Sequence, residues 1–359
     1  MVLHCMRSQK TAVCVSTATQ TFHAQKRCRN EENMEIGKVP ENVLKRAVFK
    51  NIHHRRKEVL VHPGVGEDCA AVEVADDEIL VFSTDPITGT DQGIGRLAVH
   101  INANDIASSG AEPIGILTSL ILPPNAKEKH LRQIMKEIDA ACYELQIEVM
   151  GGHTEISDVV NRPVINVTGV GKVKKDKLIK TGGLEPGDEL VVSKWIGLEG
   201  TSIIAATKQE ELLKTLPQEL IDSAASFTKY LSVVPEAAVA VENGVTAMHD
   251  ITEGGIFGAL WEMAEASGVG LNVDLKKIPV KQETIEVCEV FNLNPYKLIS
   301  SGSMLIGCKN GNIMVEKLAK KGIPAAVIGR AVEGNDKIIV NGDSNRYLEQ
   351  PSCDELYKI

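Results

Sequence analysis

Apolar residues recur every three or four positions in three segments of the first half of the chain. Residues 127–145 have this spacing, which predicts a long amphipathic helix. Residues 95–108 have it too and are followed by Gly110, a residue type that commonly ends helices. A first helix is predicted over residues 40–52, with proline at its start. The strands predicted between these helices, from short runs of apolar and β-branched residues, are 69–74, 79–83, 114–122, 147–150 and 164–173.

The second half of the chain shows the same alternation of strand and helix patterns. Helices are predicted from about residue 201 to 241 and over residues 254–266, 282–290 and 312–320. Strands are predicted over residues 190–193, 245–248, 270–273, 303–308 and 325–328. Because strands alternate with helices in both halves, each half is predicted to have a mixed α/β or α+β fold.

A segment dense in glycine and proline, residues 180–190 (KTGGLEPGDEL), separates the two halves. We therefore predict one domain over residues 34–179, a second over residues 180–345 and a tail over residues 346–359. Residues 1–33 differ from the rest, because their first 30 positions hold five Lys or Arg and no acidic residue. They are predicted to be a disordered extension, the alternative being an organelle transit peptide.

Composition and charge exclude several classes of function. The formal net charge of −9 argues against a general binder of nucleic acid or of anionic membrane surfaces. No apolar run approaches the roughly 20 residues that span a bilayer. Eight cysteines without a Cys-x-x-Cys pair argue against zinc-ribbon and thioredoxin-type sites and fit a cytoplasmic protein.

Four motifs place acidic residues beside glycines or at the ends of predicted elements. Carboxylates are hard oxygen ligands for Mg²⁺, and exposed N–H groups at the start of a helix bind anions. Each motif alone could be a solvated turn or a helix cap, but several together favour Mg²⁺ with a polyphosphate. The motifs are GVGEDCAAV (64–72) with Asp68, STDPITGT (83–90) with Asp85 at a predicted strand end, HINANDIASSGAEP (100–113) with Asn104 and Asp105, and HDITEGG (249–255) with Asp250, Gly254 and Gly255.

A fifth motif, EVMGGHTEIS (148–157), is predicted to be a loop at the end of a strand. Its His-x-Glu spacing is that of zinc deaminases, but no Pro-Cys-x-x-Cys follows, so that hypothesis fails. The chain also lacks a P-loop and a Gly-x-Ser-x-Gly elbow. Gly151, Gly152, His153, Thr154 and Glu155 leave two interpretations open, a tight turn or a loop that holds a phosphate.

Taken in order, the five motifs resemble the AIR synthase superfamily, and most of all its HypE-like, AIR synthase-related branch, over residues 37–340. The resemblance implies two α/β domains and a homodimer whose N-terminal strands pair into a β-barrel. It also implies ATP and Mg²⁺ as cofactors, with phosphoryl transfer to an amide or carboxyl oxygen. By motif it assigns Asp68, Asp85 and Asp105 to the metal, Asp105, Asp250 and Glu155 to catalysis, and Asn104, Gly151, Gly152, His153, Thr154, Gly254 and Gly255 to the nucleotide.

The sequence departs from the HypE pattern at two motifs and at its end. HypE has Asp-Thr-Lys where this chain has His153-Thr-Glu155, and Asp-Pro-Thr-Arg-Gly-Gly where it has Asp250-Ile-Thr-Glu-Gly-Gly. HypE ends in Pro-Arg-Ile-Cys, whose cysteine accepts a carbamoyl group, whereas six residues follow Cys353. The leading hypothesis is therefore an ATP- and Mg²⁺-dependent enzyme that acts on an unidentified amide, carboxylate or phosphate acceptor, either a small molecule or a protein.

Two alternatives stay open. The first is a HypE-type hydrogenase maturation factor, which would dehydrate a carbamoyl group on a C-terminal cysteine and need a carbamoyltransferase partner. The second is a nucleotide-binding regulator that keeps the fold without turnover. It predicts that ATP raises the melting temperature but is not hydrolysed with any acceptor.

Overall fold

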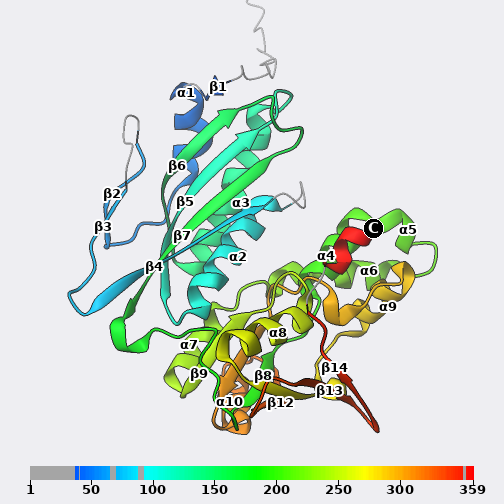
Figure 1. Ribbon diagram of the computed structural model, residues 1–359. Coiled ribbons are helices and arrows are strands. Elements are labelled where there is room, and N and C mark those ends of the chain that lie inside the picture. The colour runs from blue at the N-terminus through cyan, green and yellow to red at the C-terminus, as the bar shows by residue number, and fades with distance from the viewer. Residues whose placement is uncertain (1–36, 40, 65–69, 88–92, 351–352) are drawn as a thin grey trace, which may run out of the picture. The chain divides into compact units, whose positions relative to one another are not determined.

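The N-terminal half is built on a five-stranded sheet (Figure 1). The computed structural model describes residues 37–39, 41–64, 70–87, 93–350 and 353–359. Strands β5 and β6 run parallel, and the other neighbours run antiparallel, in the order β1-β6-β5-β7-β4. The strands are β1 (Gly37–Lys38), β4 (Glu78–Ile87), β5 (Glu112–Leu122), β6 (Glu148–Ile156) and β7 (Val164–Lys174).

Helices α2 (Ile94–Ser108) and α3 (Glu128–Leu145) cover one face of this sheet (Figure 1). Their apolar stripes meet every second residue of the strands, since successive strand side chains point to opposite faces. Leu120 of β5 and Val167 of β7 are thus buried in one core with Ile138 of α3. Smaller elements precede β4, namely α1 (Glu41–Val43), a π-helical turn (Leu44–Val48), a 3₁₀ turn (Phe49–Asn51) and the paired strands β2 (Val59–Val61) and β3 (Ala71–Val72).

The C-terminal half has a seven-stranded sheet in the order β14-β13-β10-β12-β8-β11-β9. Its strands are β8 (Glu189–Ser193), β9 (Val245–Asp250), β10 (Gly270–Asp274), β11 (Met304–Cys308), β12 (Ala325–Val332), β13 (Lys337–Asn341) and β14 (Ser344–Tyr347). Its helices are α4 (Leu198–Thr207), α5 (Gln209–Leu212), α6 (Gln218–Ala225), α7 (Val234–Glu242), α8 (Gly255–Ser267), α9 (Gln282–Phe291) and α10 (Gly311–Ala319). The mixed α/β architecture predicted for both halves is confirmed.

The strands of the N-terminal half form an open sheet in the single chain, so the β-barrel across a homodimer stays a prediction. The face away from α2 and α3 carries exposed side chains, among them Phe82, which is 62% exposed. Within the ranges that the structure describes, no helix is both long and apolar enough to cross a bilayer.

Several predicted strands are too short, two of them at candidate site motifs. Strand β4 continues through Asp85 and Pro86 to Ile87, because β4 is an edge strand, where a residue without an N–H is tolerated. Strand β6 likewise continues through the glycine pair to Ile156, because β5 pairs with it along its whole length. The register shifts by one residue beside Gly151, which indicates a β-bulge at the point where the loop was expected.

Asn104 of α2 joins the two halves. Its Nδ2 donates to the carbonyl of Leu231 at 2.8 Å, and its Oδ1 accepts from the N–H of Val233 at 2.8 Å. Lys194, which follows β8, binds the same segment, because its Nζ donates to the carbonyls of Tyr230 and Ser232. The segment before α7 is therefore held by both halves at once.

Replacing Asn104 with alanine is expected to lower the free energy of unfolding by about 2–4 kcal/mol, since it leaves a buried N–H and a buried carbonyl without partners. Urea unfolding of the variant measures this loss, with the exposed Asn161→Ala as control. An N104A variant as stable as the wild type but weaker in ATP binding would contradict this structural role and favour the predicted contact with nucleotide.

Candidate active site

Two of the predicted metal ligands meet between β4 and α2. Ser83 and Asp85 alternate along β4 and share the face that α2 covers, and Asp105 lies on α2. Ser83 Oγ is 2.5 Å from Asp105 Oδ2 and 3.4 Å from Asp85 Oδ2. Asn102 Nδ2 is 3.4 Å from Asp85 Oδ2 and donates to the carbonyl of Val167 at 3.2 Å. Strand and helix therefore bring together two carboxylates that lie 20 residues apart in the sequence.

Asp250 brings a third carboxylate from the C-terminal half. It is the last residue of β9, a strand that contacts α2, and only 3% of its surface is exposed. Its Oδ2 has no hydrogen-bond partner within the described part of the chain. Asp85, Asp105 and Asp250, called the acid cluster below, therefore form one site between the two halves.

The surroundings of the acid cluster disfavour the ionised form of Asp105 and Asp250. Burial, then the charge of Asp250 and the contact with Asp85, raise the pKa of Asp105 to about 9. Burial also raises the pKa of Asp250, although the nearby His249 opposes this shift. Perturbed carboxyl groups of this kind, gathered between two domains, favour a functional site over a purely structural one.

The donor set suits Mg²⁺, which prefers oxygen ligands and commonly takes one or two carboxylates together with water and phosphate oxygens. The unpaired Oδ2 of Asp250 is an oxygen atom of this kind. Among the described residues, no three His, Cys, Asp or Glu side chains stand close enough to hold a metal by themselves. Asp68, the remaining predicted ligand, lies outside the described residues.

Glu155 and His153 lie apart from the acid cluster. His153 Nε2 is 3.1 Å from Glu155 Oε2, so both side chains are on the face of β6 that α2 and α3 leave open, whereas Thr154 is buried. Two strands separate β6 from β4, which puts them roughly 14 Å apart at the usual strand spacing. Glu155 therefore does not join Asp105 and Asp250, and the predicted roles of these strand residues in nucleotide binding stay predictions.

Gly254 and Gly255 begin α8 as predicted, four residues after Asp250. Both have positive φ, and a Cβ on Gly255 would lie 2.7 Å from the carbonyl oxygen of Tyr296, so no other residue fits there without a shift. The N–H of Gly254 does not face open solvent, because it donates to Asp354 Oδ2 at 2.7 Å. The predicted anion site thus already holds a carboxylate from the tail of the same chain.

The sequence pattern did not indicate that the tail docks at this position. Asp354 is buried, and its neighbour Cys353 is the exposed cysteine among the described ones. The sequence did offer one indication of order in the tail, namely an aspartate in a position to cap a helical turn. Asp354 caps the 3₁₀ turn Glu355–Lys358 by accepting from the N–H of Leu356. Cys353 is therefore held at the loop between Asp250 and α8.

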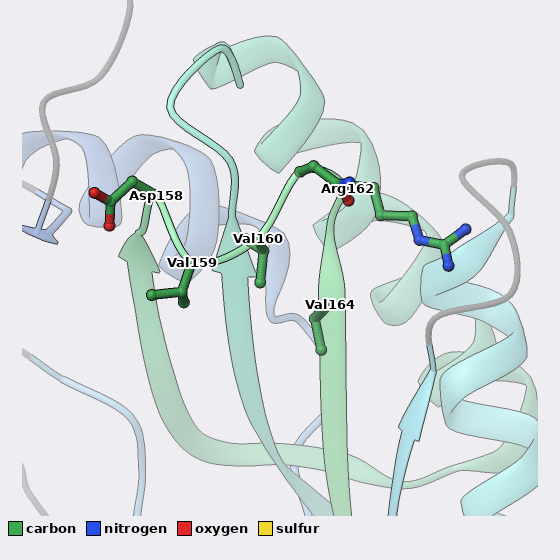
Figure 2. Close-up of a pocket in the computed structure, with 6 residues that line it drawn as sticks. Asp158, Val159, Val160, Arg162 and Val164 are labelled. Atoms are coloured by element: carbon green, nitrogen blue, oxygen red, sulfur yellow. The ribbon is translucent and has the colours of Figure 1, made fainter.

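A separate hollow lies at the turn between β6 and β7 (Figure 2). Figure 2 shows the side chains of Asp158 and Arg162 pointing away from one another at the two ends of this turn. Ligand sites usually have polar groups that converge on one point, and no residue of the acid cluster lines this hollow. Its lining residues are Asp158, Val159, Val160, Asn161, Arg162 and Val164.

Family models match both halves of the chain. The model for the N-terminal domain of AIR synthase related proteins matches residues 66–173, and the model for their C-terminal domain matches residues 185–341. The chain belongs to the AIR synthase related family. The family predicted from the five motifs is thus confirmed, and the two halves are domains of the AIR synthase related type.

Similar proteins place the chain in the HypE-like branch. A putative hydrogenase expression/formation protein of Methanocaldococcus jannaschii is 28% identical over 337 residues, which cover 90% of this chain and 97% of that protein. The carbamoyl dehydratase HypE of Cupriavidus necator is 29% identical over 287 residues, covering 77% and 78%. The branch predicted from the motifs is confirmed by these relatives.

Solved structures show the same fold. The hydrogenase maturation protein HypE in complex with ATP superposes with a TM-score of 0.75 at 20% identity, covering 89% of this chain and 97% of that one. A HypE–HypF complex gives a TM-score of 0.67 at 23% identity, covering 76% and 90%. At such identities the likeness extends to the two-domain mixed α/β fold.

Proposed function

We propose that this protein is an ATP-dependent enzyme of the HypE type, which dehydrates a carbamoyl group carried on Cys353. The observation that carries the proposal is the docked tail. Asp354 binds the N–H of Gly254, and the acid cluster residue Asp250 lies four positions before that glycine. The exposed thiol of Cys353 belongs to the residue next to Asp354, which binds the loop that follows Asp250. The similarity to proteins named carbamoyl dehydratase HypE supports this reaction over an unidentified acceptor.

The proposed reaction balances as a dehydration driven by ATP. The carbonyl oxygen of the S-carbamoyl group attacks the γ-phosphorus of ATP, so one P–O bond forms and the bond to ADP breaks. The carbon–oxygen bond then breaks and phosphate leaves with the oxygen. The nitrogen gives one proton to this phosphate and one to solvent, which leaves a thiocyanate. Mg²⁺ held by Asp85 and Asp105 would neutralise phosphate charge, and Asp250 faces the same site from the other half.

The proposed reaction needs a donor that loads the carbamoyl group onto Cys353. A structure of HypE bound to HypF supports a protein partner for this step. We propose a carbamoyltransferase as this donor, which loads Cys353 where it is exposed. The homodimer, and ATP with Mg²⁺ as cofactors, are part of the same proposal.

Replacing Cys353 with serine is expected to abolish covalent loading and the phosphate release that depends on it. Intact-mass spectrometry after incubation with a carbamoyltransferase and its carbamoyl donor should show one added carbamoyl group on the wild type. Addition of ATP and Mg²⁺ should then remove one water. The buried thiols of Cys142, Cys288 and Cys308 serve as internal controls, since burial raises their pKa and keeps them from reacting.

The alternatives give different results in the same experiment. Phosphate release that persists in C353S with an amide or carboxylate added from a metabolite screen would overturn the carbamoyl proposal and favour the unidentified acceptor. ATP that raises the melting temperature of the wild type without being hydrolysed under any of these conditions would favour the regulator.

A further inference from the structure

The six residues after Cys353 form an anchored segment, called the anchor below, rather than a free end. Residues 354–359 end beside α4, α6 and α9 (Figure 1), where Leu356 and Ile359 pack against a core that includes Ala224 and Val287. Glu355 is buried, and its Oε2 accepts from the N–H of Asn294 at 3.1 Å. The anchor therefore has apolar as well as polar contacts with the C-terminal domain.

Asp354 is the best-connected residue of the anchor. Its carboxylate accepts three backbone hydrogen bonds, from Gly254 at 2.7 Å, from Leu356 at 2.9 Å and from Ile299 at 3.2 Å. Only 3% of its surface is exposed. Hydrogen bonds to a charged group are about twice as strong as neutral ones, so this carboxylate ties together the loop before α8, the segment before β11 and the tail itself.

Three backbone N–H groups hold the carboxylate of Asp354 in place. Burial and the charge of Glu253 raise its pKa, and the three N–H groups oppose that shift. Burial likewise raises the pKa of Glu199 to about 7, with small further contributions from Asp354 and Glu253. Removing the carboxylate of Asp354 would therefore leave two buried N–H groups from outside the tail without partners.

We propose that Asp354 is a positioning residue that fixes the tail, and with it Cys353, on the loop before α8. Because neighbouring Cα atoms are about 3.8 Å apart, an anchored Asp354 keeps Cys353 at one place. The consequence for catalysis rests on the proposed function: Cys353 reacts on a docked tail, with a fixed position relative to Asp250, instead of swinging on a free C-terminal end. The anchoring itself does not depend on that function.

The anchoring can be tested on the full chain without ATP or any partner. Carboxypeptidase Y removes residues from a free C-terminus, and intact-mass spectrometry follows the loss of Ile359 and its neighbours over time. Asp354→Asn keeps the size of the side chain but places an amide group against N–H donors. We expect D354N to be trimmed about tenfold faster than the wild type, the effect of weakening one charge-assisted hydrogen bond.

Two further variants make the test decisive. Asp343→Asn removes an exposed acid in the turn between β13 and β14 and should be trimmed at the wild-type rate. Asp354→Glu keeps the charge and should be trimmed more slowly than D354N, which separates anchoring from general loss of folding. Equal trimming of D354N and wild type, whether both are protected or both are cut quickly, would overturn the proposal.

A kinetic measurement separates positioning from a purely structural role. In the Cys353-dependent reaction, D354N is expected to lower kcat while the KM for ATP stays at the wild-type value, because Asp354 binds the tail and is not a member of the acid cluster. A raised KM for ATP with unchanged kcat would contradict the positioning role. If the proposed function is wrong, C353S will leave turnover unchanged, whereas the difference in trimming between D354N and wild type will persist.

Discussion

Replacing Asp105 with asparagine is expected to lower ATP turnover by roughly 100-fold or more, the scale of effect seen when one electrostatic stabiliser is removed from an active site. Asparagine has the same shape but no charge, so it cannot neutralise Mg²⁺ or a developing charge at the phosphate. Asp85→Asn should have a similar effect, and the double variant should be inactive. The measurement is phosphate release with Mg-ATP and the carbamoyl-loaded protein.

The matched control is Asp158→Asn, which neutralises an exposed acid in the hollow of Figure 2 and should leave turnover unchanged. Wild-type turnover in the double variant of Asp85 and Asp105 would show that the acid cluster is not the metal site. Loss of turnover in D158N as well would indicate that the active site includes the β6–β7 turn.

The stability of the Asp105→Asn variant shows whether its loss of turnover is due to lost chemistry or to lost folding. The folded chain holds an extra proton on Asp105, so the free energy of unfolding should fall as pH rises from about 4, the unfolded pKa, to about 9, the folded pKa. Asparagine cannot ionise, so D105N removes this loss. In chelator, the variant should therefore melt at a higher temperature than the wild type at neutral pH, although it is inactive.

Replacing Gly152 with alanine is expected to destabilise the protein by about 3 kcal/mol or more, the range of severe backbone and packing clashes. Gly152 has φ of 150°, and a Cβ there would lie 2.0 Å from the carbonyl oxygen of Thr118 on the neighbouring strand. The clash is with backbone inside the β5–β6 ladder, so a small side-chain movement cannot relieve it. Thermal and urea unfolding measure the loss.

Gly151→Ala is the control, because its Cβ would meet only Leu117 Cδ2 at 3.2 Å, the end of a flexible side chain. It should cost less than about 1 kcal/mol. The pair also tests the predicted nucleotide contact, since weaker ATP binding in a stable G151A variant would support it. Equal stability of G152A and G151A would contradict the observed pairing of β5 with β6.

Most elements could be predicted from the sequence because their patterns are local. Helices α2 and α3 follow directly from the spacing of apolar residues, as do the strands around them. The prediction missed β13 and β14. Strand β14 has no aliphatic residue and in the described sheet pairs only with β13, whereas β13 has a short apolar run, Ile338 to Val340, and pairs with β10 and β14. The prediction ended β4 at Ser83, before Pro86, because the edge position that tolerates proline is a property of the whole sheet.

The members of the acid cluster were also evident in the sequence, since Asp85, Asp105 and Asp250 each stand out beside a polar motif. Their meeting was not, because they come from two domains and the contact depends on how α2 packs against β9. Asn104 stood out for the same reason, but its amide holds the segment before α7 in place. A motif thus identifies reactive residue types, whereas packing decides which of them share a site.

The family, the mixed α/β class and the identity of the acidic residues could be predicted from the sequence, because each depends on local spacing or on short motifs. The place of Gly151 to Glu155 inside β6 and the docking of the tail through Asp354 could not. Both depend on partners that are distant in the sequence, namely β5 for the glycines and the N–H groups of Gly254 and Ile299 for the carboxylate. Backbone pairing carries little side-chain signal, so it becomes visible only in the folded chain.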